Sequence, residues 1–199
     1  MKSHLDTLHA GLADRAAAEG LLDVAYREVD SPLGRLLLAS TEAGVVRVAF
    51  AVEDHDRVLG DLADRVSPRV LKAPRRLDAV AVALEDYLAG RSRRVDVPVD
   101  LRLLTGYRRE VVEALPTIRY GDTATYAELA GRTDRPRAVR AVGSACANNP
   151  VPLVLPCHRV VRSDGSEGGY RGGPEAKRQL LRLERGEDGH PCPEPRHGR

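Results

Sequence analysis

The spacing of apolar residues changes once along the chain, and this change limits the folds that the chain can adopt. Between residues 24 and 50, apolar residues fall in three short runs, 25–31, 34–40 and 45–50, separated by turn-forming residues. Such runs predict a small antiparallel sheet. Beyond residue 101 the apolar residues follow a helical spacing instead. We therefore expect a small α/β unit followed by a mostly α-helical unit.

Two helices are expected to cover the sheet. One spans residues 53–65 and is polar, whereas the other spans residues 76–88 and carries an apolar stripe. Charged residues then alternate with Val and Pro over residues 91–101, which favours a linker. No catalytic constellation is visible in this first unit. The apolar stripe of the helix expected at residues 76–88 consists of Leu77, Val80, Leu84 and Leu88.

These patterns predict two domains, at residues 22–95 and 96–186. Residues 1–21 are expected to form an N-terminal extension, either a short helix or a loose segment, because their leucines have helical spacing. By composition, residues 187–199 are expected to form a disordered tail. The leucines of the extension are Leu5, Leu8 and Leu12.

A helix-turn-helix is predicted in the second unit. Helical spacing covers residues 106–115, 125–130 and 137–147, and the break at residues 131–136 has the length and breaker residues of such a connection. Plain packing helices give the same signal. We expect one side of the third helix to be buried: Ala138, Val139, Val142, Ala145 and Cys146.

The opposite side of that helix consists of Arg137, Arg140, Ala141 and Ser144. Two guanidinium groups among small side chains allow a nucleic-acid backbone to come close and be neutralised. A solvated helix face is an equally good explanation from this helix alone. Residues 101–199 hold 17 Lys and Arg against 12 Asp and Glu, whereas residues 1–100 hold 14 against 17. This basic excess fits a polyanionic partner as well as a solvated surface.

The cysteines indicate the compartment. Cys146, Cys157 and Cys192 are odd in number and include no Cys-x-x-Cys pair, which disfavours a disulfide framework and a zinc site. No apolar stretch is long enough for a signal peptide or a membrane span. We expect a cytoplasmic protein without a metal or a membrane contact, in which Cys192, His190 and His197 of the tail are bystanders.

The segment Leu155-Pro-Cys-His-Arg-Val160 is the candidate chemical centre. A thiol is nucleophilic as the thiolate, so a reactive cysteine needs a neighbour that takes its proton, and His158 follows Cys157 directly. The proton can pass through a water as well as through direct contact. Three prolines, Pro150, Pro152 and Pro156, predict a stiff, extended approach to the sulfur. The alternative is a cysteine that only fills the core.

Glu184 is the candidate third member of this centre. The last helix is expected to run from residue 174 to about residue 185, and Glu184 falls within its apolar arc. A carboxylate there needs a partner, because burying it unpaired costs several kcal/mol. We expect that partner to be His158, although pairing with Arg182 or Arg185 at the surface is the alternative. The arc contains Ala176, Leu180, Leu181 and Leu183.

The run Pro150-Val-Pro-Leu-Val-Leu-Pro-Cys-His-Arg-Val160 closely resembles the active-site signature of the O6-alkylguanine-DNA alkyltransferases, the methylated-DNA–protein-cysteine methyltransferases. The resemblance extends from Tyr107 to Glu184 and, more loosely, over the unit from Val24. It implies a ribonuclease H-like α/β domain followed by a helix-turn-helix DNA-binding domain. Tyr107 and Val112 stand where many members carry Phe and Trp, which affects the core and leaves the chemistry alone.

The resemblance also implies the activity. Duplex DNA containing O6-alkylguanine is the expected partner, O4-alkylthymine is an expected second substrate, and the damaged base is flipped out of the stack. The alkyl group then passes irreversibly to the cysteine of a monomeric protein that uses no cofactor and reacts once. No cysteine precedes Cys146, so zinc-dependent methyl-phosphotriester repair and transcriptional activation are disfavoured.

Roles are implied for individual residues. Cys157 corresponds to the alkyl acceptor, His158 to its water-linked base and Glu184 to the group that orients the base. Asn149 corresponds to the asparagine that braces the cysteine turn. Arg140 corresponds to the arginine that fills the space left by the flipped base, on the face formed with Arg137, Ala141 and Ser144.

The resemblance assigns the substrate pocket as well. Tyr126 is expected to meet the guanine and crowd the adjacent phosphate. Pro152 and Tyr170 are expected to line the alkyl pocket, and the backbone N–H of Arg171 to face O6. The carbonyls of Cys157 and Val160 are expected to accept from the guanine amino group. We expect the sulfur at the mouth of a pocket that a flipped purine can enter.

Two rival functions remain at this point. One is a damage-sensing DNA binder like the alkyltransferase-like proteins, which replace the cysteine that is intact here. The other is a cysteine hydrolase that uses Cys157, His158 and Glu184 on acyl substrates, which leaves the Arg140 helix without a role.

Overall fold

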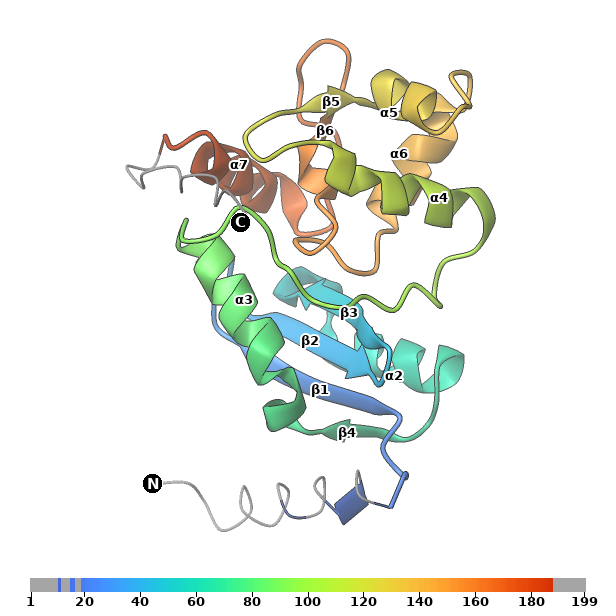
Figure 1. The fold of residues 1–199 in the computed structure, drawn as a ribbon, viewed down its shortest axis with the longest axis vertical. Helices are drawn as coiled ribbons and strands as arrows, with labels where there is room; N and C mark the ends of the chain where they lie inside the picture. The colour runs from blue at the N-terminus through green and yellow to red at the C-terminus, as the bar shows by residue number, and fades with distance from the viewer. Residues whose placement is uncertain (1–10, 12–14, 17–18, 188–199) are drawn as a thin grey trace, which may run out of the picture.

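The first unit is built on a four-stranded sheet (Figure 1). The structure is a computed structural model that describes residues 11, 15, 16 and 19–187, so most of the N-terminal extension and almost all of the tail lie outside the described residues. The strand order is β3-β2-β1-β4. Strands β1 (Val24–Val29), β2 (Leu36–Thr41) and β3 (Gly44–Phe50) form the expected antiparallel meander. Strand β4 (Val70–Lys72) was not expected and pairs parallel with β1.

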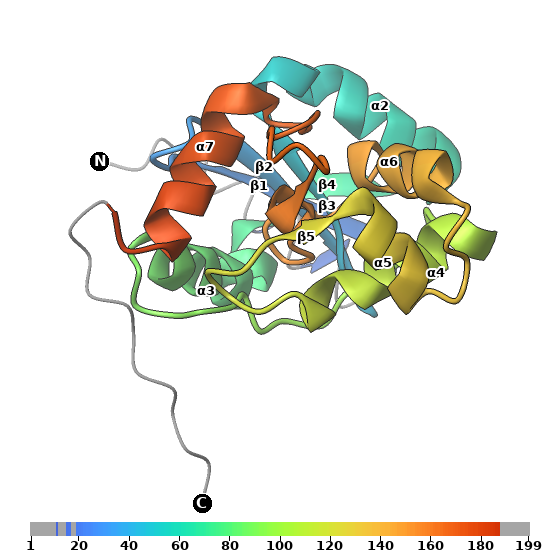
Figure 2. The same cartoon turned by 90° about the horizontal axis from the view of Figure 1, so that it is seen from above.

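Helices α2 (His55–Arg65) and α3 (Asp78–Leu88) cover opposite faces of this sheet (Figure 2). Because side chains alternate along a strand, β2 feeds both faces. Leu36 and Leu38 belong to the cluster that contains the stripe of α3, whereas Leu37 packs with the residues of α2. The sheet is therefore buried on both sides, as the two predicted helices require.

The linker lies along the outer edge of β3. The backbone N–H of Val45 donates to the carbonyl of Pro98 at 2.8 Å, and that of Asp100 donates to the carbonyl of Val45 at 2.8 Å. The carboxylate of Asp100 also accepts from the hydroxyl of Thr41 at 2.5 Å. The linker is thus fixed to the sheet before the chain enters the second unit.

The second unit is helical, as expected. It contains α4 (Gly106–Ala114), α5 (Tyr126–Arg132), α6 (Val139–Ala147) and α7 (Gly173–Glu184). A short parallel pair, β5 (Ala124–Thr125) and β6 (Val160–Val161), joins the start of α5 to the segment after Cys157. Within the described residues, no helix has both the length and the apolar character needed to cross a bilayer.

Helices α5 and α6 pack together across a tight turn. Thr125 and Glu128 form a capping box at the start of α5, which fixes its first turn. Asp134 adopts φ 56° in the connection. Helix α6 begins at Val139, so Arg137 lies in the turn. The expected burial of Val139 is wrong: its side chain is 37% exposed, because it occupies the first turn of α6.

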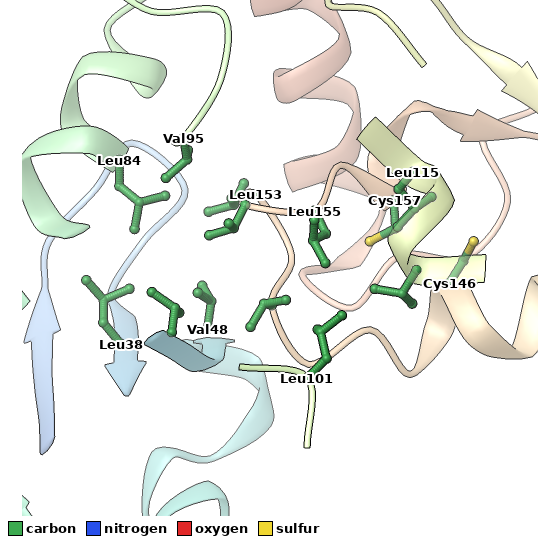
Figure 3. Close-up of a cluster of buried hydrophobic side chains, with 14 of the residues drawn as sticks. Leu38, Val48, Leu84, Val95, Leu101, Leu115, Cys146, Leu153, Leu155 and Cys157 are labelled. Atoms are coloured by element: carbon green, nitrogen blue, oxygen red, sulfur yellow. The ribbon is translucent and has the colours of Figure 1, made fainter. Parts of the chain in front are cut away.

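One core runs through both units (Figure 3). Leu38 and Leu84 of the sheet unit belong to the same cluster of buried side chains as Leu155, Cys146 and Cys157. The linker contributes Val95 and Leu101 to this cluster. The cysteine environment is therefore continuous with the packing of the sheet.

Candidate active site

Residues 149–156 form a turn, so the expected extended approach to the cysteine is wrong. The side-chain Oδ1 of Asn149 accepts from the N–H of Val151 at 3.1 Å, and its Nδ2 donates to the carbonyl of Leu155 at 2.8 Å. Leu153 has φ 73° at the centre of the turn. The proline ring fixes φ near a value that occurs both in extended segments and in turns. The prolines are therefore compatible with either conformation, and the hydrogen bonds of Asn149 select the turn. This bracing is the part expected of Asn149.

The turn is attached to the sheet. The N–H of Val48 in β3 donates to the carbonyl of Pro150 at 2.9 Å, and the guanidinium of Arg47 donates to the same carbonyl at 3.2 Å. The position of the turn is therefore set by the edge strand of the first unit.

Cys157 follows this turn and is nearly buried. Its Sγ accepts from Nδ2 of Asn149 at 3.2 Å, and the residue is 3% exposed. Burial raises the pKa of the thiol to about 11, although the bond from Asn149 opposes the shift. The expectation of a sulfur at an open pocket mouth is therefore not met. A hollow of about 890 Å³ lies instead between α3, α7 and the β1–β2 turn, and neither Cys157 nor His158 lines it.

His158 and Glu184 form the expected contact. Nε2 of His158 lies 2.8 Å from Oε1 of Glu184, and the two residues are 0% and 3% exposed. Glu184 is thus a buried carboxylate, not a surface group. Burial alone raises the pKa of Glu184, but the hydrogen bonds from His158 and Arg159 and the charge of Arg159 outweigh it and hold the pKa at about 2.

The second ring nitrogen of His158, Nδ1, determines whether the His158–Glu184 pair can accept a proton. Burial lowers the pKa of His158, so the imidazole is neutral at neutral pH. A carboxylate beside Nε2 favours the proton on Nε2, which leaves Nδ1 as an acceptor. Nδ1 is buried and has no hydrogen-bond partner among the described residues, the sulfur of Cys157 included. Nδ1 is therefore a free acceptor inside this cluster.

Two further residues of this cluster were missed in the sequence. Arg159 donates to both carboxylate oxygens of Glu184, at 2.9 Å to each, and to the carbonyl of Ile118 at 2.7 Å. Tyr87 of α3 places its hydroxyl 3.1 Å from Nε2 of His158 and donates it to Oε1 of Glu184. A signal for Tyr87 was present, since it lies three residues after Leu84 on the buried stripe and a buried tyrosine hydroxyl requires a partner. The signal for Arg159 was only its place next to His158.

The loop before α7 covers the other side of His158. The ring of Tyr170 lies edge-on to His158 at 6.2 Å and to Phe50 at 5.5 Å, and its hydroxyl is buried without a partner among the described residues. The side chain of Arg171 bonds to Glu53 and, at 3.4 Å, to the carbonyl of Asn149. Nothing in the sequence pointed to Glu53. The sheet unit therefore holds this loop as well.

The other residues assigned to the substrate lie in the cysteine turn and in the segment that follows it. Pro152 is buried in the turn. The carbonyl of Val160 already accepts from Nζ of the buried Lys177 at 2.6 Å, and that of Cys157 accepts from the N–H of Val160. A carbonyl has two lone pairs, so these bonds alone leave room for a second donor at each oxygen. No group of three or more His, Cys, Asp or Glu in the described part of the chain is placed to hold a metal.

Tyr126 stands at the start of α5, half-buried. Burial raises the pKa of its hydroxyl, which therefore stays protonated and can donate. Gly168, at φ 66°, passes so close that a Cβ there would lie 2.6 Å from the Tyr126 oxygen. The loop and the tyrosine are thus matched, and a larger residue at position 168 would displace the hydroxyl.

The predicted DNA-contacting face is exposed. Arg137, Arg140 and Ala141 are exposed and Ser144 is partly buried. Neither Arg137 nor Arg140 has a hydrogen bond or ion pair within the described residues. These two guanidinium groups are therefore available to an anionic partner.

Two family models match the chain. Residues 24–101 match "6-O-methylguanine DNA methyltransferase, ribonuclease-like domain", and residues 106–186 match "6-O-methylguanine DNA methyltransferase, DNA binding domain". Together they cover more than half of the chain.

Named relatives agree with these matches. The chain is 36% identical over 162 residues to the methylated-DNA–protein-cysteine methyltransferase of Mycolicibacterium paratuberculosis, covering 81% of this chain and 93% of that one. It is 39% identical over 166 residues to the bifunctional transcriptional activator/DNA repair enzyme Ada of Escherichia coli, covering 82% of this chain but only 46% of that protein. The crystal structure of Mycobacterium tuberculosis OGT in complex with DNA superposes with a TM-score of 0.70 at 35% identity, covering 81% of this chain and 92% of that one.

Proposed function

This chain belongs to the 6-O-methylguanine DNA methyltransferase family, and from that membership we propose that it repairs DNA directly, by moving the alkyl group of an O6-alkylguanine onto the sulfur of Cys157. The observation that carries the proposal is the buried cluster in which Asn149 holds the sulfur while Glu184 holds His158 with its Nδ1 free.

The reaction is a displacement at saturated carbon. The proton of the Cys157 thiol passes through a water to Nδ1 of His158, and the thiolate attacks the alkyl carbon. The new S–C bond forms as the C–O6 bond breaks, and the guanine leaves with the electron pair. The proton that the thiol gave up restores neutral guanine. Because the pKa of the thiol is about 11, removal of this proton is part of the barrier, and His158 lowers it as a general base.

Donors around the base stabilise its developing charge. In this proposal the hydroxyl of Tyr126 and the backbone N–H of Arg171 serve as such pre-organised donors. The carbonyls of Cys157 and Val160 accept from the amino group, and Pro152 and Tyr170 border the alkyl group. O4-alkylthymine offers the same alkyl-oxygen bond and is a second substrate. Because Cys157 is nearly buried, the base gains access only when side chains around the sulfur move.

Duplex DNA lies against α5 and α6. Arg140 enters the base stack and fills the space that the flipped base leaves, while Arg137 neutralises phosphate and the small residues Ala141 and Ser144 allow close approach. The thioether formed at Cys157 has no route back to a thiol in this site, so each molecule reacts once. The acceptor must be a free thiol, and Cys146 and Cys157 are both unpaired, which fits a protein of the cytoplasm.

Mass spectrometry tests the transfer. After incubation with duplex DNA that contains O6-methylguanine, we expect one added methyl group on the peptide that contains Cys157, and no more than one equivalent of product. An unmodified peptide with tight binding favours a damage sensor. Product formed beyond one equivalent favours a hydrolase that turns over.

Substitution of Arg140 tests the DNA-binding role. Arg140→Ala is expected to slow repair of duplex DNA about 100-fold, because each lost contact to flipped-base DNA is worth up to a few kcal/mol. The rate of reaction with free O6-benzylguanine should stay within about twofold of the wild-type rate, because only the duplex leaves a space to fill. Single-turnover rates with both substrates measure this. Arg109→Ala on α4, which removes an equal charge from another exposed site, is the control, and equal losses on both substrates contradict the assigned role.

A further inference from the structure

We propose that Tyr87, on helix α3 of the sheet unit, is a positioning residue that fixes the proton of His158 on Nε2 and so keeps Nδ1 ready to receive the proton of Cys157. This inference rests on the proposed alkyl transfer. It assigns to the first unit a part in the chemistry of the second.

The geometry around the Tyr87 hydroxyl is specific. Its oxygen lies 3.1 Å from Nε2 of His158, and the hydroxyl donates to Oε1 of Glu184. A phenol has one proton. Since that proton is directed at the carboxylate, the remaining lone pairs of the Tyr87 oxygen face Nε2. Two acceptors, Tyr87 and Glu184, therefore surround Nε2, and both require a proton on that nitrogen.

The hydroxyl is locked in this position. Tyr87 is 1% exposed, and its ring packs edge-on against Tyr120, with ring centroids 6.2 Å apart. Burial and the nearby charge of Glu184 raise the pKa of Tyr87 well above 10, so the hydroxyl remains protonated and remains a donor. Tyr87 therefore cannot exchange roles with Glu184 during the reaction.

The Tyr87 hydroxyl also reduces the negative charge that Glu184 presents to His158. Oε1 of Glu184 accepts from Tyr87, from His158 and from Arg159, so its negative charge is shared among three donors. The titratable or charged groups that face His158 are Tyr87 on α3, Glu184 and Lys177 on α7, the adjacent Cys157 and Arg159, and Tyr170 on the loop.

Removal of the hydroxyl changes this balance in one direction. Without the Tyr87 donor, Oε1 presents more charge to the Nε2 proton and favours the imidazolium form of His158. A histidine that already carries both protons cannot accept one from Cys157. The acidic limb of the transfer rate should therefore move to higher pH, although the aromatic ring is kept.

The experiment is the pH dependence of the single-turnover rate with free O6-benzylguanine, for the full chain and for Tyr87→Phe. We expect the variant to react about tenfold more slowly near neutral pH and its acidic limb to lie about one pH unit higher. The matched control is Tyr120→Phe, which removes the hydroxyl that donates to the carbonyl of Leu183 at 3.5 Å and keeps the ring that packs against Tyr87. Its profile should match that of the wild-type chain.

Nuclear magnetic resonance of the wild-type chain with ¹⁵N-labelled histidine gives an independent reading. The His158 signal, assigned from its loss in His158→Gln, should show Nε2 protonated and Nδ1 bare at neutral pH. At the same pH, Tyr87→Phe should show a larger fraction of His158 with both nitrogens protonated. A wild-type proton on Nδ1, an unchanged limb in Tyr87→Phe, or an equal effect of Tyr120→Phe each overturns the inference. Failure of the wild-type chain to take up the benzyl group overturns the proposed function instead, and the tautomer still decides the role of Tyr87.

Discussion

Cys157→Ser is expected to abolish alkyl transfer and to leave binding to damaged duplex DNA within about twofold of the wild-type value. An alcohol is far less ionised than a thiol at neutral pH, and the buried site raises the cost of the anion further. We expect a loss of about a thousandfold or more in single-turnover rate, the scale of losing a nucleophile. Quench-flow kinetics and a DNA-binding titration measure the two effects.

Cys146 provides the control for this substitution. It is the other described cysteine, is 5% exposed and lies in the same core cluster. Burial raises the pKa of its thiol further than that of Cys157, so it is a poorer nucleophile than Cys157. Cys146→Ala should therefore still take up one methyl group. Residual transfer in Cys157→Ser that disappears on also changing Cys146 would show that the acceptor is misassigned.

Glu184→Gln is expected to destabilise the folded chain by about 3–5 kcal/mol, the cost of removing one partner from a buried ion pair. The amide cannot neutralise the guanidinium of Arg159, which is 6% exposed. For a chain of this size the loss corresponds to a midpoint of thermal unfolding about 10 °C lower. Calorimetry measures it, and Glu175→Gln, which changes an exposed pair with Arg178, should move the midpoint by little.

The same carboxylate predicts how stability depends on pH. The pKa of Glu184 is about 2 in the folded chain against an ordinary value of 4.5. Because this pKa is lower in the folded chain, ionised Glu184 stabilises the folded state fully above pH 4.5, and this stabilisation is lost as pH falls through 2. The stabilisation amounts to about 3 kcal/mol. Urea unfolding at pH 6, 4 and 2.5 should show this decline in the wild-type chain and a smaller one in Glu184→Gln. Parallel declines would mean that the pKa of Glu184 is not lowered in the folded chain.

The sequence predicted the parts of the fold that repeat locally. The strands of the meander and the helices have periodic apolar residues, so their positions were accessible to within a few residues. Glu184 was accessible for a different reason. It broke an otherwise apolar arc of α7, and the cost of an unpaired buried carboxylate predicts a partner. The predicted contact with His158 is confirmed, whereas the residue that neutralises the charge is Arg159, which was missed.

The missed features depend on distant contacts. Strand β4 has three residues and β5 and β6 have two each, too few for a periodic signal. The turn at residues 149–156 depends on side-chain bonds of Asn149, which the prolines alone do not reveal. Tyr87 meets His158 and Glu184 across 71 and 97 residues of chain. Only the packing of α3 beneath α7 makes that contact visible.

Strand β3 ends the sheet on one side, and an unpaired end strand invites addition of a strand from another molecule. Here the N–H and carbonyl of Val45 and the N–H of Val48 bond to Pro98, Asp100 and Pro150 of the same chain. We therefore expect the bond that holds the cysteine turn to protect this edge against strand addition as well. Substitutions that loosen this turn should reduce the yield of non-aggregated protein on expression as well as the rate of repair.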